Sequence, residues 1–297
     1  MKTNPAVSII IPYHKKKFFF IKTIESIINQ NFKRFEVLII YDDDNLDELN
    51  FIKKIKKKYS KVKLIINKKI LGPGLSRNKG IILSKGKYVA FCDADDIWQP
   101  DKLARQMPEF RDKDVGVVYS EVAYINDQGF SLPKEPSTDR ESGWVTSHLV
   151  IKNFIPFGTA VMRRACIDRH GGFDENLPMG IDWDLWLRFS VAWKFMYVPE
   201  VTYLYRIWPG QMSKNYRGRY ENAFKILNKF LSANPEAVPP VIIARAWADM
   251  YVGRAMCVAQ AEKTIIEPLS DLVRGLRYDM TYYLAWKSLA KLFLRRV

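Results

Sequence analysis

Three carboxylates lie in one six-residue stretch of the chain, which ends in Asp93-Ala94-Asp95-Asp96. Carboxylates this close repel one another unless a cation lies among them. A hard divalent ion such as Mg²⁺ or Mn²⁺, shared with the phosphates of a substrate, is the natural partner of such a cluster. The alternative is a strand-to-helix turn in which an aspartate caps the helix, and these residues alone do not separate the two interpretations.

The residues around this cluster predict where it lies in a fold. Residues 87–92 form a short run rich in β-branched and aromatic side chains, which is typical of a buried strand. Pro100 and Asp101 follow at the point where a helix would begin. The acids are therefore predicted at the carboxyl end of a strand, where open α/β sheets bind their ligands.

Strands and helices are predicted to alternate through the first third of the chain. Apolar runs and helical periodicity predict strands over residues 7–12, 35–41, 62–66 and 87–92, and helices over 18–30, 46–59 and 75–84. This alternation predicts an α/β fold with a doubly wound, mostly parallel sheet flanked by helices.

The rest of the chain predicts more elements of the same fold and then a change of architecture. In order, the patterns predict a helix over residues 102–110, a strand over 115–119, a polar loop over 127–142, a helix over 144–153 and a strand over 157–162. From residue 216 onward helical patterns dominate, over 220–233, 241–262 and 268–297. We therefore expect one α/β domain over residues 1–215 and a helical C-terminal extension over 216–297.

A second acidic group, Asp42 to Asp44, follows the predicted strand 35–41. In a twisted parallel sheet both strand ends lie at the same edge and face one crevice. This coincidence favours a functional site over helix capping. A carboxylate at the end of the second strand can accept hydrogen bonds from a nucleobase or a ribose, while the later cluster holds a metal.

Composition and charge narrow the class of protein. The hydrophobic content of 48% indicates a real core, and the three scattered cysteines indicate a reducing cytosol without disulfides. No secretory signal and no membrane span is predicted. The net charge of +15 predicts a polyanionic partner: nucleic acid, anionic lipid or a nucleotide. A basic nucleic-acid-binding or scaffold protein, however, would leave the acids at two strand ends unexplained.

Two further stretches carry groups that could act on a substrate. Arg77, in a glycine-containing helix start, can hold a phosphate through two nitrogens. Asp182 begins a predicted helix beside Gly180 and is well placed to face a cleft, whereas Asp184 and Arg188 are expected to form a local ion pair.

The order of these motifs closely resembles family 2 glycosyltransferases of the GT-A fold over about residues 7–215. The motifs that carry the resemblance are Val7-Ser8-Ile9-Ile10-Ile11-Pro12, Phe35-Glu36-Val37-Leu38-Ile39-Ile40, Ser76-Arg77-Asn78-Lys79-Gly80 and Gly86 to Asp96. The resemblance implies an inverting transferase that moves a sugar from a nucleoside diphosphate, UDP being favoured, to an acceptor hydroxyl. A metal-dependent nucleotidyltransferase is the alternative enzyme, but it would carry a glycine-rich basic loop where this chain has Pro12-Tyr13-His14-Lys15.

The resemblance also implies roles for single residues. The residues implied to bind the nucleotide-sugar are Pro12, His14, Asp42, Arg77, Asp93 and Ala94. Asp95 is the implied ligand of Mn²⁺ or Mg²⁺, and Asp182 is the implied general base. Trp183 and Trp208 are candidates for acceptor or donor contacts, Trp208 lying where many members carry a histidine.

The composition of the C-terminal tail indicates the kind of acceptor and the location of the protein. Residues 282–296 are aromatic, apolar and basic together, which is the composition of an interfacial helix on anionic lipid. Packing of this helix on its own domain or on a second subunit is the other interpretation. We expect a surface-polysaccharide or lipid-linked glycan acceptor, no nucleic-acid partner, and a cytoplasmic protein at the inner face of the cell membrane.

Overall fold

The computed structural model describes residues 4–133, 139–209 and 215–294, which form two compact units. The first comprises Met1–Trp144, Ile155–Asn176 and Ala192–Gln211, and the second comprises Val145–Phe154, Leu177–Val191 and Met212–Val297. The units do not follow a single boundary at residue 215, because two segments before it pack with the C-terminal helices. The division into a domain over residues 1–215 and a C-terminal extension over 216–297 stays a prediction.

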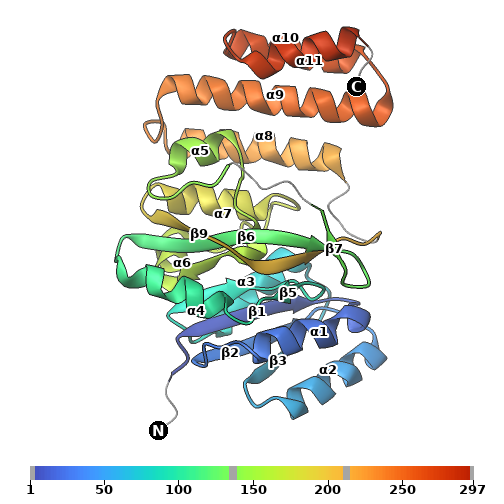
Figure 1. The fold of residues 1–297 in the computed structure, drawn as a ribbon, viewed down its shortest axis with the longest axis vertical. Helices are drawn as coiled ribbons and strands as arrows, with labels where there is room; N and C mark the ends of the chain where they lie inside the picture. The colour runs from blue at the N-terminus through green and yellow to red at the C-terminus, as the bar shows by residue number, and fades with distance from the viewer. Residues whose placement is uncertain (1–3, 134–138, 210–214, 295–297) are drawn as a thin grey trace. The chain divides into compact units, whose positions relative to one another are not determined.

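A single sheet forms the centre of the first unit (Figure 1). Within the described residues it has nine strands in the order β3-β2-β1-β4-β8-β6-β9-β5, with β7 paired to β6. The strands are β1 (Val7–Tyr13), β2 (Phe35–Tyr41), β3 (Val62–Ile66), β4 (Tyr88–Phe91), β5 (Ile97–Trp98), β6 (Val115–Ile125), β7 (Ser131–Leu132), β8 (Val161–Arg163) and β9 (Lys194–Arg206).

Helices cover both faces of this sheet. The helices of the first unit are α1 (Lys17–Ile28), α2 (Leu46–Lys58), α3 (Pro73–Leu83), α4 (Lys102–Gln106) and α6 (Arg164–His170), with 3₁₀ turns η1 (Met107–Arg111) and η2 (Phe157–Thr159). Ile9 of β1 belongs to a buried cluster with Phe20 of α1 and Ile52 of α2. Ile10, on the other face, meets α3 at Gly80, where an added Cβ would lie 2.4 Å from it. β1 is therefore buried on both faces, which explains its unbroken apolar sequence.

Strands β1 to β4 pair in parallel, as predicted, but the sheet continues with mixed pairing. β8 runs antiparallel to both β4 and β6, and β9 runs parallel to β6. The predicted strand over 157–162 is wrong in its first half, which forms the turn η2. The sequence analysis missed β9, because Pro199 and Glu200 interrupt its apolar pattern. Register shifts against β6 on both sides of Glu121 show how the sheet accommodates this interruption.

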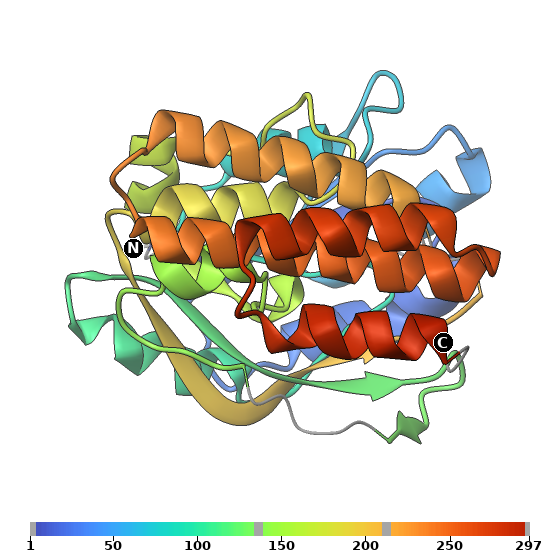
Figure 2. The ribbon, with the colours of Figure 1, turned by 90° about the horizontal axis from the view of Figure 1, so that it is seen from above.

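The second unit is helical, and α9 is its longest element. Its helices are α5 (Thr146–Ile151), α7 (Ile181–Ser190), α8 (Tyr216–Ala233), α9 (Pro240–Glu262), α10 (Ile266–Tyr278) and α11 (Tyr283–Phe293). Helices α10 and α11 lie side by side against α9 (Figures 1 and 2). The predicted continuous helix over 268–297 is wrong, because the helix is interrupted between α10 and α11. Asp279 accepts hydrogen bonds from Thr281 at this interruption. In the described part of the chain, no helix combines the length and apolar character that a membrane crossing requires.

A lysine is completely buried in the core of the first unit. The Lys102 ammonium donates hydrogen bonds to Gln106 Oε1 (2.8 Å) and to the Thr159 carbonyl, and it lies 5.0 Å from the Trp98 ring centroid. No carboxylate contacts it among the described residues. Burial lowers the pKa of Lys102 to about 7.

We predict that Lys102→Met removes a pH dependence of stability. The ordinary pKa of lysine in an unfolded chain is about 10.4, so the unfolded chain binds more protons than the folded one between about pH 7 and pH 10. The free energy of unfolding of the parent protein should therefore rise with pH over this window, by up to about 4 kcal/mol. Urea unfolding at pH 6, 7.5 and 9 should show that the variant lacks this rise.

The exposed Lys113→Met serves as the matched control, since it removes the same charge from the surface. If the free energy of unfolding changes with pH in the same way in Lys102→Met and in the parent protein, Lys102 is not buried with a lowered pKa.

Candidate active site

The two acidic groups lie at one edge of the sheet, as predicted. β1 pairs in parallel with β2 on one side and with β4 on the other, so all three carboxyl ends point the same way. Asp42 follows β2 directly, and Asp93 comes two residues after the end of β4. The segment His14 to Lys16, which follows β1, lies between the two groups.

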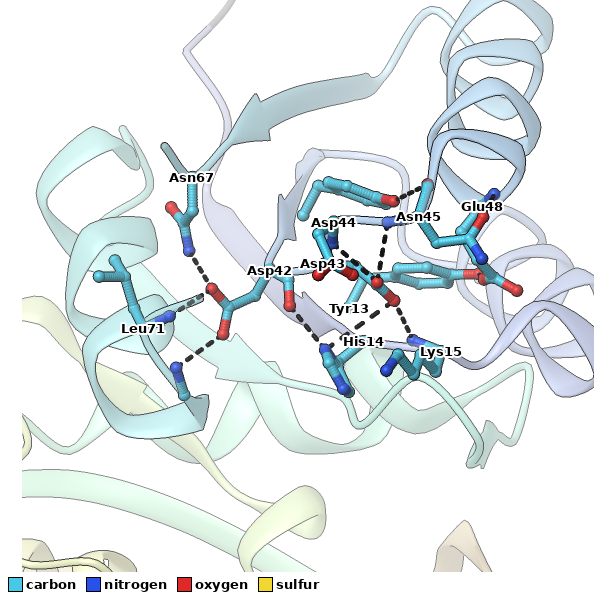
Figure 3. A network of polar contacts seen from close by, with 12 residues as sticks. Tyr13, His14, Lys15, Asp42, Asp43, Asp44, Asn45, Glu48, Asn67 and Leu71 are labelled. Atoms are coloured by element: carbon cyan, nitrogen blue, oxygen red, sulfur yellow. Dashed lines mark hydrogen bonds and ion pairs between the residues drawn. The ribbon is translucent and has the colours of Figure 1, made fainter. Parts of the chain in front are cut away.

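The Asp42 carboxylate is almost completely buried and binds the loop that leads into α3 (Figure 3). It accepts hydrogen bonds from Asn67 Nδ2 (2.8 Å) and from the backbone N–H groups of Leu71 and Gly72 (2.7 Å each). Gly72 adopts a φ of +84°, which favours glycine at this turn. Asp42 thus positions the glycine-containing loop, and its predicted contact with a nucleobase stays a prediction.

Asp43 anchors the turn after β1 (Figure 3). Its carboxylate accepts hydrogen bonds from the backbone N–H groups of Lys15 (2.8 Å), Asp44 (2.8 Å) and Asn45 (3.1 Å). Burial acts to raise the pKa of Asp43, but these hydrogen bonds outweigh it and hold the pKa below its usual value. His14 Nδ1 lies 2.7 Å from the Asp42 carbonyl oxygen and donates to it.

Asp95 contacts two donors from distant parts of the chain. Lys16 Nζ lies 3.0 Å from Asp95 Oδ2, and Trp208 Nε1 donates to the same oxygen at 2.9 Å. The Lys16 ammonium also lies 3.9 Å from the Trp208 ring centroid, and the ring of Phe19 packs on Trp208. Lys16 is a site residue that the sequence analysis missed, since it is one of three consecutive lysines.

Asp93 is paired with Arg77. Arg77 Nη2 lies 2.7 Å from Asp93 Oδ1, and the guanidinium stacks 4.7 Å from the ring of Phe157. Arg77 Nε is buried and has no hydrogen-bond partner among the described residues. The structure therefore brings the predicted phosphate-binding arginine to the acidic cluster.

Asp96 is the buried support of the cluster. It accepts hydrogen bonds from the Tyr203 hydroxyl (2.6 Å) and the Arg206 backbone N–H (2.7 Å). Burial raises the pKa of Asp96 well above its usual value, and the charges of Asp93 and Asp95 raise it further. Because Tyr203 and Arg206 belong to β9, the missed strand, sequence analysis could not connect them to the site.

Two other predicted donor-site residues are parts of the scaffold. Pro12 lies in β1 opposite Ile40 of β2. Ala94 is buried, and its carbonyl accepts a hydrogen bond from Thr23 Oγ1 of α1 (3.2 Å). Their contacts with a nucleotide-sugar stay predictions.

Asp182 belongs to the second unit, in the first turn of α7. Its Oδ2 accepts a hydrogen bond from Asn153 Nδ2 (3.0 Å), and the side chain is partly exposed. The expected ion pair of Asp184 with Arg188 is confirmed at 2.7 Å, and Lys229 also contacts Asp184. Trp183 is buried and donates to the Leu149 carbonyl, so it packs within this unit. The catalytic role of Asp182 and a substrate contact of Trp183 stay predictions.

The acids at the sheet edge suit a metal ion that is shared with a substrate. Among the described residues, no three His, Cys, Asp or Glu side chains come together as a complete metal site. A diphosphate-bound Mg²⁺ or Mn²⁺ needs only one or two protein carboxylates, and Asp93 and Asp95 can supply them. The residues present therefore fit a metal that arrives with a nucleotide rather than one held by the protein alone.

Sequence comparisons give the family of this chain. Residues 8–170 match the profile described as glycosyl transferase family 2. An uncharacterized glycosyltransferase of Methanocaldococcus jannaschii is 30% identical over 208 residues, covering 69% of this chain and 71% of the relative. The amylovoran biosynthesis glycosyltransferase AmsB of Erwinia amylovora is 30% identical over 65% of this chain and 67% of its own length. The chondroitin synthase of Escherichia coli is 27% identical over 78% of this chain, but only 33% of its length is covered.

Solved structures share the fold at low sequence identity. TarS of S. aureus, residues 1–349, in complex with UDP-GlcNAc superposes with a TM-score of 0.62 at 18% identity, covering 93% of each chain. The mannosyltransferase PcManGT from Pyrobaculum calidifontis, in complex with GDP-Man and Mn²⁺, gives a TM-score of 0.59 at 15% identity over 100% of this chain and 89% of the other. With acids at the ends of the two strands that flank β1, this fold and the family profile, the chain belongs to glycosyltransferase family 2.

Proposed function

We propose that this glycosyltransferase transfers a sugar from a nucleoside-diphosphate donor to an acceptor hydroxyl, with inversion at the anomeric carbon. The observation that carries the proposal is the meeting of Asp42, Asp93 and Asp95 at one sheet edge around the segment His14 to Lys16. Two cations, Lys16 and Arg77, already contact the acids at this edge. They offer positive charge to a diphosphate, while the acids accept hydrogen bonds from the nucleoside.

UDP is the favoured nucleotide. The TarS structure was solved with UDP-GlcNAc, although PcManGT was solved with GDP-Man and Mn²⁺. The relatives that make chondroitin and amylovoran support a polysaccharide or lipid-linked glycan as the acceptor. A lipid-linked acceptor would require contact with a membrane surface, which the C-terminal helix was predicted to make.

We propose that Asp95 is the metal ligand. A bound Mn²⁺ or Mg²⁺ supplies Lewis-acid stabilisation of the charge on the departing diphosphate. Access to Asp95 Oδ2 requires the Lys16 ammonium and the Trp208 N–H to leave this oxygen. Lys16 then becomes a free cation beside the site, and Trp208, which replaces a histidine common in the family, adds no ligand.

We propose that Asp182 is the general base. The acceptor hydroxyl must lose a proton as its oxygen attacks the anomeric carbon, and a carboxylate within hydrogen-bond reach can take it. The hydrogen bond from Asn153 to Asp182 Oδ2 supports this role, because it orients the carboxylate.

We predict that Asp182→Asn lowers the rate of transfer by roughly 10²- to 10⁴-fold while leaving the Kd for UDP within about twofold. The amide has nearly the same shape as the carboxylate but cannot accept the proton. A coupled assay of UDP release with a glycan acceptor measures turnover, and calorimetry measures UDP binding. Asp174→Asn, in a surface turn, serves as the control, and unchanged turnover in Asp182→Asn would remove the assigned role.

We predict opposite effects on Mn²⁺ binding for two variants at the sheet edge. Asp95→Ala should weaken Mn²⁺ binding in the presence of UDP by roughly tenfold or more, or about 1.4 kcal/mol. Lys16→Met should instead tighten Mn²⁺ binding to the nucleotide-free protein by roughly two- to fivefold, because a competing, partly exposed ion pair is gone. The electron paramagnetic resonance signal of free Mn²⁺ measures both.

Neighbouring residues provide matched controls for this pair. Asp44→Ala removes an exposed acid at the same edge, and Lys17→Met removes the adjacent, exposed lysine. Equal Mn²⁺ affinities for Lys16→Met and Lys17→Met would show that Lys16 does not occupy Asp95 in solution.

A further inference from the structure

Helices α10 and α11 of the second unit carry an unusual density of exposed apolar side chains. Helix α11 contacts α9 through Ala285 and Leu292, which are buried with Tyr282. Its opposite side exposes Tyr283 (67%), Trp286 (47%) and Phe293 (66%). These three lie at positions i, i+3 and i+10, so they share one side of the helix. The sequence left two interpretations of this segment open, packing on its own domain and contact with anionic lipid. One side of α11 packs on α9, and the exposed aromatic rings lie on the other side.

On the same two helices, the acidic side chains are paired with arginines of neighbouring helices, whereas four basic side chains are exposed. The acids of residues 263–294 are Glu267, Asp271 and Asp279, and each pairs with an arginine of α8 or α9. The exposed cations of α10 and α11 are Arg274, Arg277, Lys287 and Lys291. No ion pair joins these four to an acid within the described residues. The outward side of the pair therefore carries positive charge without nearby negative charge.

Aromatic rings next to unpaired lysines suit one kind of partner. At the surface of an anionic bilayer, aromatic rings enter the boundary between headgroups and acyl chains, while lysine and arginine reach the lipid phosphates. A second copy of this chain is a poor occupant, since a two-fold contact would place the same four cations against each other. We propose that the face formed by Val273, Arg274, Arg277, Met280, Tyr283, Trp286, Lys287, Lys291 and Phe293, the α10–α11 face, docks on an anionic lipid bilayer.

This inference does not depend on glycosyl transfer, and it is tested with the full chain and no nucleotide-sugar. Sedimentation with vesicles of phosphatidylcholine containing 30% phosphatidylglycerol should pull down the protein, whereas pure phosphatidylcholine vesicles should bind it at least about tenfold more weakly. Raising the salt from 0.1 M to 0.5 M should weaken binding, because it screens the attraction between the cations and the lipid phosphates. Absence of binding to the anionic vesicles at 0.1 M salt would overturn the proposal.

Two double variants separate the apolar and the charged contributions. Trp286→Ser with Phe293→Ser should weaken binding by roughly tenfold or more, because the rings no longer enter the bilayer. Lys287→Gln with Lys291→Gln should weaken it by roughly 10- to 30-fold and is not expected to disturb folding, since both side chains are exposed. Matching thermal unfolding of the variants and the parent protein checks that the fold is intact.

The control changes are made on other exposed surfaces. Lys54→Gln with Lys57→Gln on α2 removes the same charge, and Phe130→Ser, 67% exposed, removes a ring elsewhere in the chain. These controls should keep at least about half of the binding. Equal losses in the controls and in the α10–α11 variants would show that only the overall charge attracts the protein, which overturns the proposal. A concentration-dependent dimer, abolished by the serine variants in sedimentation velocity, would overturn it in favour of a subunit interface.

Discussion

Charge balance among carboxylates at one sheet edge is the constraint on which the site depends. The edge gathers the aspartates at positions 42, 43, 93, 95 and 96, and they do not all have the same kind of partner. Asp42 and Asp43 accept backbone N–H groups, whereas Asp93 and Asp95 contact Arg77 and Lys16. Asp96 accepts hydrogen bonds from the Tyr203 hydroxyl and the Arg206 backbone N–H, and burial raises its pKa. The protein therefore holds its acids together with donors and cations of its own chain.

Strand β9 connects the acidic stretch 93–96 to the segment that follows β6. Arg206, at its end, donates from Nε to the Asp95 carbonyl (2.7 Å) and from Nη1 to the carbonyls of Asn126 and Asp127. Its backbone N–H bonds Asp96, and its guanidinium lies 4.8 Å from the ring of Phe19. One buried cation thus fixes the backbone of the acidic cluster to the end of β6. This frame holds the backbone of Asp95 in place.

The second unit follows the opposite rule for its charges. The acids Glu267, Asp271 and Asp279 are paired with Arg217, Arg254 and Arg245, whereas Arg274, Arg277, Lys287 and Lys291 are exposed. The net charge of +15 is spread over the chain. On α10 and α11 four exposed cations lie on the same two helices as exposed aromatic rings.

Local patterns were sufficient to predict the first half of the sheet. The strands at 35–41 and 62–66 have the predicted bounds, because apolar residues dominate both segments and polar segments flank them. β9 and the break between α10 and α11 were not predictable in this way. Pro199 and Glu200 are accommodated only by a register shift against β6, and the break depends on hydrogen bonds of Asp279. Both features result from contacts with neighbouring segments, which a sequence pattern does not contain.

The site, too, was predictable only in part from local patterns. The order of residues alone predicts that aspartates follow two strands and that a cation must compensate them, because like charges at short spacing repel in any conformation. Which lysine contacts Asp95 depends on the fold. Lys15, Lys16 and Lys17 are equivalent in the sequence, but Lys15 adopts a φ of +50° and its N–H binds Asp43. That turn directs Lys16 to Asp95 and Lys17 toward the ring of Phe51, since an ion pair depends on distance in space and not on distance along the chain.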